Sequence, residues 1–192
     1  MSQGGKAMKE IIKVHGPLGK QDVKNWEIGD IIEYTGDIYT ARDAAHKRMQ
    51  KAVEEGTPQV MDFADKFVFY AGPCPTPPGR IMGSIAPTTA ARMDGFVEMT
   101  LKLGMLGMIG KGDRAPHVAE LCKEYGGVYL LSIGGASTMI SNQVRECEVV
   151  AYEDLGPESI KRLRMDSMLL VVGIDVRGRI FWDEQIKLYR RD

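Results

Sequence analysis

Residues 105–133 read MLGMIGKGDRAPHVAELCKEYGGVYLLSI, and this stretch predicts the fold class of the chain. Met105–Ile109 and Val128–Ile133 are apolar runs of strand length. Pro116–Tyr125 lies between them and carries apolar side chains at helical spacing. A strand, a helix and a second strand in this order form a βαβ unit, in which the strands pair in parallel and the helix covers a face of the sheet.

The alternation of strands and helices runs from Arg80 onward, and the residues before it are richer in strands and turns. Further strand-like runs are Ile11–Val14, Asp30–Thr35, Phe67–Ala71, Arg80–Ile85, Glu148–Tyr152 and Met168–Asp175. Further helical patterns are Ala41–Glu54, Thr89–Leu103, Ala136–Val144 and Glu158–Leu163. We predict an α/β fold with a mixed sheet and flanking helices, forming one domain over residues 9–192 after a flexible tail at residues 1–8. Proline disfavours helix and central strand in Gly72–Gly79, so we expect an ordered loop there.

The charge of the 192-residue chain is nearly balanced, with 25 Lys and Arg against 26 Asp and Glu. This balance argues against a broad basic surface for nucleic acid, so a site for an anion has to be built locally. The first residues lack the apolar run of a signal peptide, and no stretch reaches the ~18 apolar residues of a membrane-spanning helix. We therefore expect a cytoplasmic protein with no nucleic-acid or membrane partner.

Two arginines lie near predicted helix starts, where free backbone N–H groups already favour anions. Thr40 and Asp43 fit a loose capping box, which places Arg42 in the first turn of a helix. Thr88 or its neighbour can cap the next helix, and Arg92 follows Thr88 by four residues. One such arginine is compatible with an ordinary surface position. Two in one chain favour a site for a small dianion such as a dicarboxylate.

A third cation follows a predicted buried strand, in the segment Gly110–Arg114. Lys111 stands between two glycines there, and it can either supply a point charge to a ligand or lie in an exposed turn. The segment is not a phosphate-binding P-loop, because Met105 and Gly112 occupy positions where that motif needs Gly and Ser or Thr.

The cysteines and one histidine are further candidates for catalysis or metal binding. Cys74, Cys122 and Cys147 form no CxxC pair, so their spacing indicates neither a zinc site nor a redox motif. Three thiols could still meet in space and hold an iron–sulfur cluster. Cys122, however, lies in an apolar helical pattern and is predicted to be buried core, so we predict no metal site on this chain. His46 follows Arg42 by one helical turn and is either a proton donor or a structural polar contact.

Six segments together form a family pattern. They are Thr40–Arg48 (TARDAAHKR), Tyr70–Pro73 (YAGP), Ala86–Asp94 (APTTAARMD), Gly110–Gly112 (GKG), Ser132–Ala136 (SIGGA) and Val150–Gly156 (VAYEDLG). The pattern resembles the β subunit of the class I fumarate hydratase and L(+)-tartrate dehydratase family, from about residue 9 to residue 183. This resemblance implies a swivelling β/β/α domain. Cys74 after Gly72 and Pro73 is similar to the two-subunit members, and we assign it no catalytic role.

The resemblance also implies an activity, that of an iron–sulfur hydro-lyase. It implies a [4Fe-4S] cluster that belongs to an α subunit and not to this chain, and an assembly of two αβ units. The reaction expected first is the reversible hydration of fumarate to L-malate, a step of the tricarboxylic acid cycle. Dehydration of L(+)-tartrate to oxaloacetate is the alternative, and a stand-alone module that binds dicarboxylates is a third reading.

Residue roles follow from the resemblance at the positions that match its motifs. The carboxylates of the substrate would be bound by three cations, Arg42, Arg92 and Lys111. Thr88 would exchange the C3 proton, although a threonine hydroxyl is a very weak base and needs activation by a neighbour. Asp43 and Asp94 would orient the two arginines.

Overall fold

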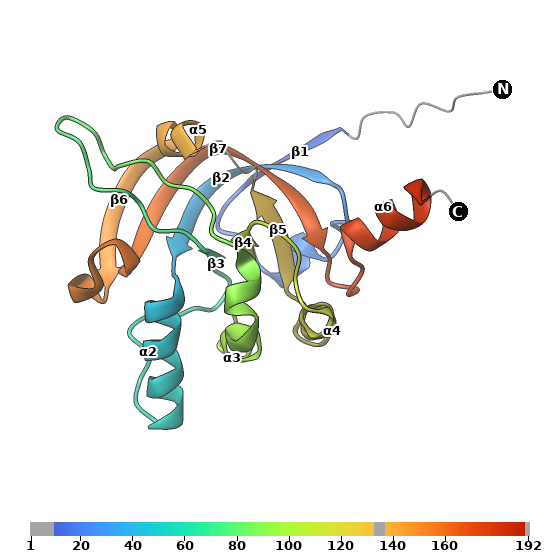
Figure 1. Cartoon of the computed structure of the whole chain (residues 1–192), viewed down its shortest axis with the longest axis horizontal. Coiled ribbons are helices and arrows are strands. Elements are labelled where there is room, and N and C mark those ends of the chain that lie inside the picture. The colour runs from blue at the N-terminus through green and yellow to red at the C-terminus, as the bar shows by residue number, and fades with distance from the viewer. Residues whose placement is uncertain (1–9, 133–136, 191–192) are drawn as a thin grey trace.

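The computed structural model describes residues 10–132 and 137–190 (Figure 1). Its seven-stranded sheet has the order β1-β2-β3-β4-β5-β7-β6. The strands are β1 Ile11–His15, β2 Ile31–Thr40, β3 Phe67–Phe69, β4 Gly107–Gly110, β5 Val128–Ser132, β6 Val144–Ala151 and β7 Ile160–Ile174. An additional antiparallel pairing of β2 with β7 closes β2, β3, β4, β5 and β7 into a barrel.

The sheet is mixed, as predicted. β1 to β5 pair in parallel along the order of the sheet, while β7 runs antiparallel to β2, β5 and β6. β2 alternates between buried and half-buried residues, because successive side chains of a strand point to opposite faces. Its buried Ile32 and Ile38 lie in the same apolar cluster as Leu163 of β7, inside the barrel.

The helices α2, α3 and α4 lie together on one side of the barrel, and α5 lies on the other side (Figure 1). The helices are α1 Lys20–Val23, α2 Asp43–Glu54, α3 Val97–Lys102, α4 Pro116–Tyr125, α5 Ser137–Asn142 and α6 Phe181–Tyr189, with 3₁₀ segments η1 Ala90–Phe96 and η2 Glu153–Glu158. A second apolar cluster joins the sheet to the helices and includes Met49, Val68 and Val118. The first cluster lies between the strands inside the barrel and the second lies between the barrel and the helices, so the layer order is β/β/α.

Two predicted elements are absent from the residues that the structure describes. Arg80–Ile85 forms no strand but belongs to the Pro-rich loop, in which Ser84 O accepts a hydrogen bond from Cys74 N at 2.9 Å. Glu158–Leu163 is not a helix, because Ile160 begins β7, which pairs with both β2 and β6. The sequence patterns also missed α1 and α6.

Some predictions lie outside the described residues, namely the flexible tail at 1–8 and most of the Ser132–Ala136 motif. Within the described ranges, no helix is long and apolar enough to cross a membrane.

Candidate functional site

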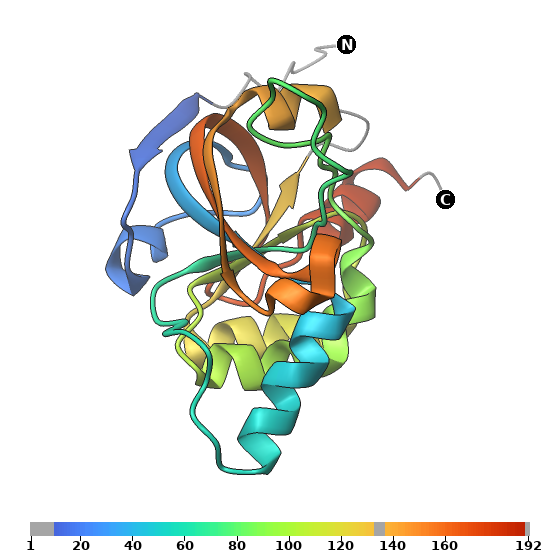
Figure 2. The same ribbon diagram turned by 90° about the vertical axis from the view of Figure 1, so that its left-hand side faces the viewer.

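Two of the predicted site residues lie at the carboxyl ends of parallel strands. Arg42 follows β2 and Lys111 follows β4 directly, and Gly72 lies at the same edge after β3. Loops at this edge of a parallel sheet come from different strands and meet in space, which is why such edges commonly hold ligands. Figure 2 shows η2 beside the start of α2 at this end of the molecule.

Backbone hydrogen bonds place Thr88 beside Lys111. Thr88 N donates a hydrogen bond to Tyr70 O at 2.7 Å, and Lys111 N donates one to Thr88 O at 3.3 Å. Ala90 N in turn donates to Lys111 O at 2.9 Å. The segment that begins at Thr88 is therefore held at the ends of β3 and β4, and the Thr88 side chain there is half-buried.

Arg92 connects Thr88 to Asp43. Its Nη1 donates to Thr88 Oγ1 at 3.3 Å, and its Nη2 donates to Asp43 Oδ2 at 2.5 Å. Asp43 begins α2, so this ion pair also ties the starts of α2 and η1 together. About half of the Arg92 side chain stays exposed, which leaves guanidinium surface for a ligand.

Arg42 lies opposite a carboxylate that the sequence analysis did not single out. Glu158 Oε1 lies 3.5 Å from Arg42 Nη2, and Glu158 Oε2 accepts a hydrogen bond from Ala44 N at 3.0 Å. Gly72 permits this approach, because a Cβ there would lie 2.9 Å from Pro157 O and 3.3 Å from Arg42 Cδ. No local pattern marks Glu158, since its partners are more than a hundred residues away in sequence.

Two details of the predicted helix starts are wrong. Thr40 is not a cap but the last residue of β2, where its Oγ1 accepts a hydrogen bond from Lys161 N at 3.0 Å. Arg42 itself occupies the N-cap position of α2, because its backbone is still extended.

The predicted role of Asp94 is also wrong. Its carboxylate pairs with Arg114 at 2.6 Å and not with Arg42 or Arg92.

Lys111 supplies the excess charge of the site. Its side chain is exposed and has no ion pair in the part of the chain that the structure describes. Arg42 and Arg92 are each paired with one carboxylate, so Lys111 is the cation of the three whose charge no ion pair in the described chain offsets. Such a cluster attracts a small anion and offers it several N–H donors.

His46 lies behind the site and is fully buried. Its Nδ1 lies 2.8 Å from Arg42 O, and its ring packs against those of Tyr70 and Phe96. A carbonyl only accepts, so Nδ1 carries the hydrogen and His46 holds the Arg42 backbone. Burial lowers the pKa of His46 to about 4, which keeps the imidazole neutral at pH 7. This geometry favours the structural reading of His46 over that of a proton donor.

We expect the neutral His46 to make the chain less stable as the pH falls from about 6.5 to about 4. Below its ordinary pKa of 6.5 the imidazole of the unfolded chain takes up a proton that the folded chain, with a pKa of about 4, does not. The loss amounts to roughly 3 kcal/mol of unfolding free energy. Urea denaturation at pH 4.5 and pH 7 measures it. His46→Gln should remove this part of the dependence and His15→Gln, at an exposed position, should not. An unchanged pH dependence in His46→Gln would contradict the prediction.

The cysteines do not gather into a site for a cluster. Cys74 is exposed in the Pro-rich loop, Cys122 is buried in α4, and Cys147 is half-buried in β6. Burial raises the pKa of Cys122 to about 12, which is unsuited to a thiolate ligand. Among the described residues, no group of three His, Cys, Asp or Glu side chains could hold a metal ion. The described residues of this chain therefore do not fit an iron–sulfur cluster.

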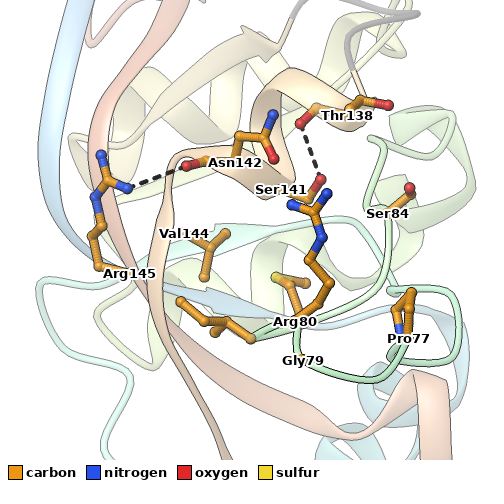
Figure 3. A pocket seen from close by; sticks show the side chains of 11 residues that line it. Pro77, Gly79, Arg80, Ser84, Thr138, Ser141, Asn142, Val144 and Arg145 are labelled. Atoms are coloured by element: carbon orange, nitrogen blue, oxygen red, sulfur yellow. Dashed lines mark hydrogen bonds between the residues drawn. The ribbon is translucent and has the colours of Figure 1, made fainter.

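A separate pocket of about 400 Å³ lies between the Pro-rich loop and α5 (Figure 3). Arg80 and Ser84 line it from the loop, and Ser141 and Asn142 line it from α5. None of the four residues predicted to bind substrate or exchange a proton lines this pocket. This pocket is therefore separate from the cationic edge of the sheet that Arg42, Arg92 and Lys111 form.

The fold and the cationic edge define an α/β domain with three cations at one edge of its sheet. A family model described as Fumarase C-terminus matches residues 2–185, and the chain belongs to this family. The relatives are named as fumarate hydratases and as β subunits of L(+)-tartrate dehydratase, so the family is one of hydro-lyases.

Relatives of both kinds are similar to the chain. It is 36% identical to fumarate hydratase 1, mitochondrial, of Leishmania major, over 91% of this chain and 32% of that protein. It is 33% identical to the L(+)-tartrate dehydratase subunit beta of Escherichia coli (strain K12), over 96% of this chain and 93% of that subunit. The putative L(+)-tartrate dehydratase subunit beta of Methanocaldococcus jannaschii is 32% identical and covered over 89% of its length. The chain thus spans about a third of the fumarate hydratase but nearly all of each β subunit.

Proposed function

We propose that this chain is the β subunit of an iron–sulfur-dependent hydro-lyase that hydrates fumarate reversibly to L-malate. One observation carries the proposal: Arg42, Arg92 and Lys111 meet at one edge of the sheet together with Thr88. The similarity to fumarate hydratases and to separate β subunits supports both the reaction class and a second subunit.

The three cations would hold the two carboxylates of the substrate. Arg42 and Arg92 are oriented before substrate arrives, because Glu158 and Asp43 already fix their guanidinium groups. Such prior orientation lowers the entropy that binding costs. Lys111 has no such carboxylate in the described chain, so it is available to pair with the dianion.

Thr88 would exchange the proton at C3 of the substrate. A hydroxyl needs help to lose its proton at neutral pH, and the Arg92 guanidinium next to Thr88 Oγ1 provides positive charge at that place. The same contact requires that Oγ1 accepts from Arg92, so the hydroxyl hydrogen is directed elsewhere. This contact is our candidate for the activation that the sequence alone left open.

The [4Fe-4S] cluster would come with an α subunit, in an assembly of two αβ units. When bound, such a cluster supplies a Lewis acid for the hydroxyl and carboxylate of the substrate. The role of this chain would be to bind and orient the dicarboxylate and to move the proton.

Tartrate dehydration is the second candidate, because the β-subunit relatives that this chain covers almost fully are named for tartrate. L(+)-Tartrate differs from malate by one hydroxyl, and the same three cations would bind its two carboxylates. The stand-alone dicarboxylate module is the third candidate. It predicts binding without any partner.

Anaerobic co-expression with an α-subunit reading frame from the same genome tests the proposal. We expect a colourless, inactive isolated chain and a coloured complex that hydrates fumarate. Parallel assays with L(+)-tartrate separate the two substrates. Calorimetric titration of the isolated chain with succinate, a dicarboxylate that cannot react, tests the module. Turnover by the isolated chain, or a cluster bound to it, would overturn the subunit assignment.

A further inference from the structure

A buried ion pair lies directly behind the cationic edge. The Arg114 side chain is fully buried, and its Nε donates to Asp94 Oδ1 at 2.6 Å. The other carboxylate oxygen of Asp94 accepts a hydrogen bond from Ala115 N at 2.8 Å. The Arg114 guanidinium lies between two aromatic rings, 4.7 Å from the centroid of Tyr129 and 5.5 Å from that of Tyr70.

The pair joins the two segments that carry the substrate-binding cations. Asp94 follows Arg92 by two residues within η1, and Arg114 follows Lys111 by three residues in the loop after β4. At their other ends, the same segments are joined by the hydrogen bond from Ala90 N to Lys111 O at 2.9 Å. The segments are therefore linked at both ends, once through the backbone and once through this side-chain pair.

Stability alone does not explain a charge pair at this place. Removing two charges from water costs about as much as their attraction returns, and well-packed apolar residues are commonly as stable or more so. What a paired carboxylate and guanidinium add is a defined geometry, because their hydrogen bonds are directional. Here the hydrogen bonds of Asp94 fix the position of η1 relative to the loop after β4.

We propose that Asp94 and Arg114 are positioning residues that set the spacing between Arg92 and Lys111, and through it the preference for dicarboxylates over monocarboxylates. The proposal rests on the proposed function of the cationic edge. A dianion needs both cations at a matching separation, whereas a monoanion needs only one of them. Loosening the link between the two segments therefore weakens dicarboxylate binding selectively.

The test uses the assembled enzyme with the double substitution Asp94→Asn and Arg114→Met. This variant leaves no buried charge unpaired and keeps a long side chain against the two tyrosine rings. Asp94→Asn alone is measured beside it as a nearly isosteric second variant. The readouts are the inhibition constants of succinate and propionate, determined by competition with the substrate. We expect the succinate constant to rise about tenfold, roughly 1.4 kcal/mol, and the propionate constant to change less than about twofold.

A matched control is Lys102→Met, which removes the exposed pair of Lys102 and Glu98 in the helix that follows η1. It should leave both inhibition constants unchanged. A partly unfolded variant loses active sites and therefore kcat, but its inhibition constants stay the same. Unchanged constants in both Asp94 variants, or equal weakening of succinate and propionate, would overturn the proposal. A wild-type complex that does not bind succinate would instead overturn the proposed function.

Discussion

Arg92→Ala should lower kcat/KM of the assembled enzyme at least about a hundredfold, which is about 2.7 kcal/mol of transition-state stabilisation. The substitution removes one cation of the carboxylate site. It also removes the guanidinium beside Thr88 Oγ1 and leaves Asp43 without its partner. The measurement is steady-state hydration of fumarate, together with circular dichroism to confirm the fold.

Two further variants make this result specific to the Arg92 guanidinium. Arg92→Lys keeps the charge but loses the planar fork, so it should recover only part of the activity. Arg145→Ala breaks an exposed ion pair with Asp166 and should leave kcat/KM unchanged. Near-normal kinetics of Arg92→Ala in a well-assembled complex would contradict the assignment of Arg92 to the substrate-binding site.

Thr88→Val should lower kcat by roughly a hundredfold to ten-thousandfold, the range typical of a lost proton-transfer group. Valine keeps the shape of threonine, and the backbone bonds of residue 88 to Tyr70 and Lys111 do not involve the side chain. KM should therefore change only a few-fold. Thr88→Ser retains a hydroxyl and should keep most of the activity. Deuterium exchange at C3 of malate measures the proton step directly, and exchange at the wild-type rate in Thr88→Val would exclude this role.

The elements with strong local signals were predicted well. α4 begins at Pro116 and ends at Tyr125 as the sequence indicated, because Pro is tolerated at the first helical turn and Gly126 adopts the left-handed conformation that ends a helix. The neighbouring strands β4 and β5 lie within two residues of their predicted bounds, since both are short, apolar and fully or nearly fully buried.

The elements that depend on distant partners were predicted less well. Residues 160–163 were assigned to a helix, but they pair with β2 and β6 as the first part of β7. Ile160 and Leu163 are spaced as on one face of a helix, but in β7 they point to opposite faces of the sheet and lie in different apolar clusters, so strand pairing overrides this short pattern. Arg80–Ile85 has the composition of a strand, yet the structure places it in the Pro-rich loop, where it pairs with no strand.

The sequence by itself determined which residues carry charge at this edge, and the helix-start and strand-end patterns indicated Arg42, Arg92 and Lys111. Local patterns suffice for this, because periodicity and turn residues report where elements begin and end. Only the tertiary structure decided the partners of Arg42 and Asp94. Glu158 reaches Arg42 because β7 closes against β2, and Asp94 pairs with Arg114 because η1 packs against the loop after β4. Such choices depend on which loops meet at the edge of the sheet, and spacing along the chain does not encode that.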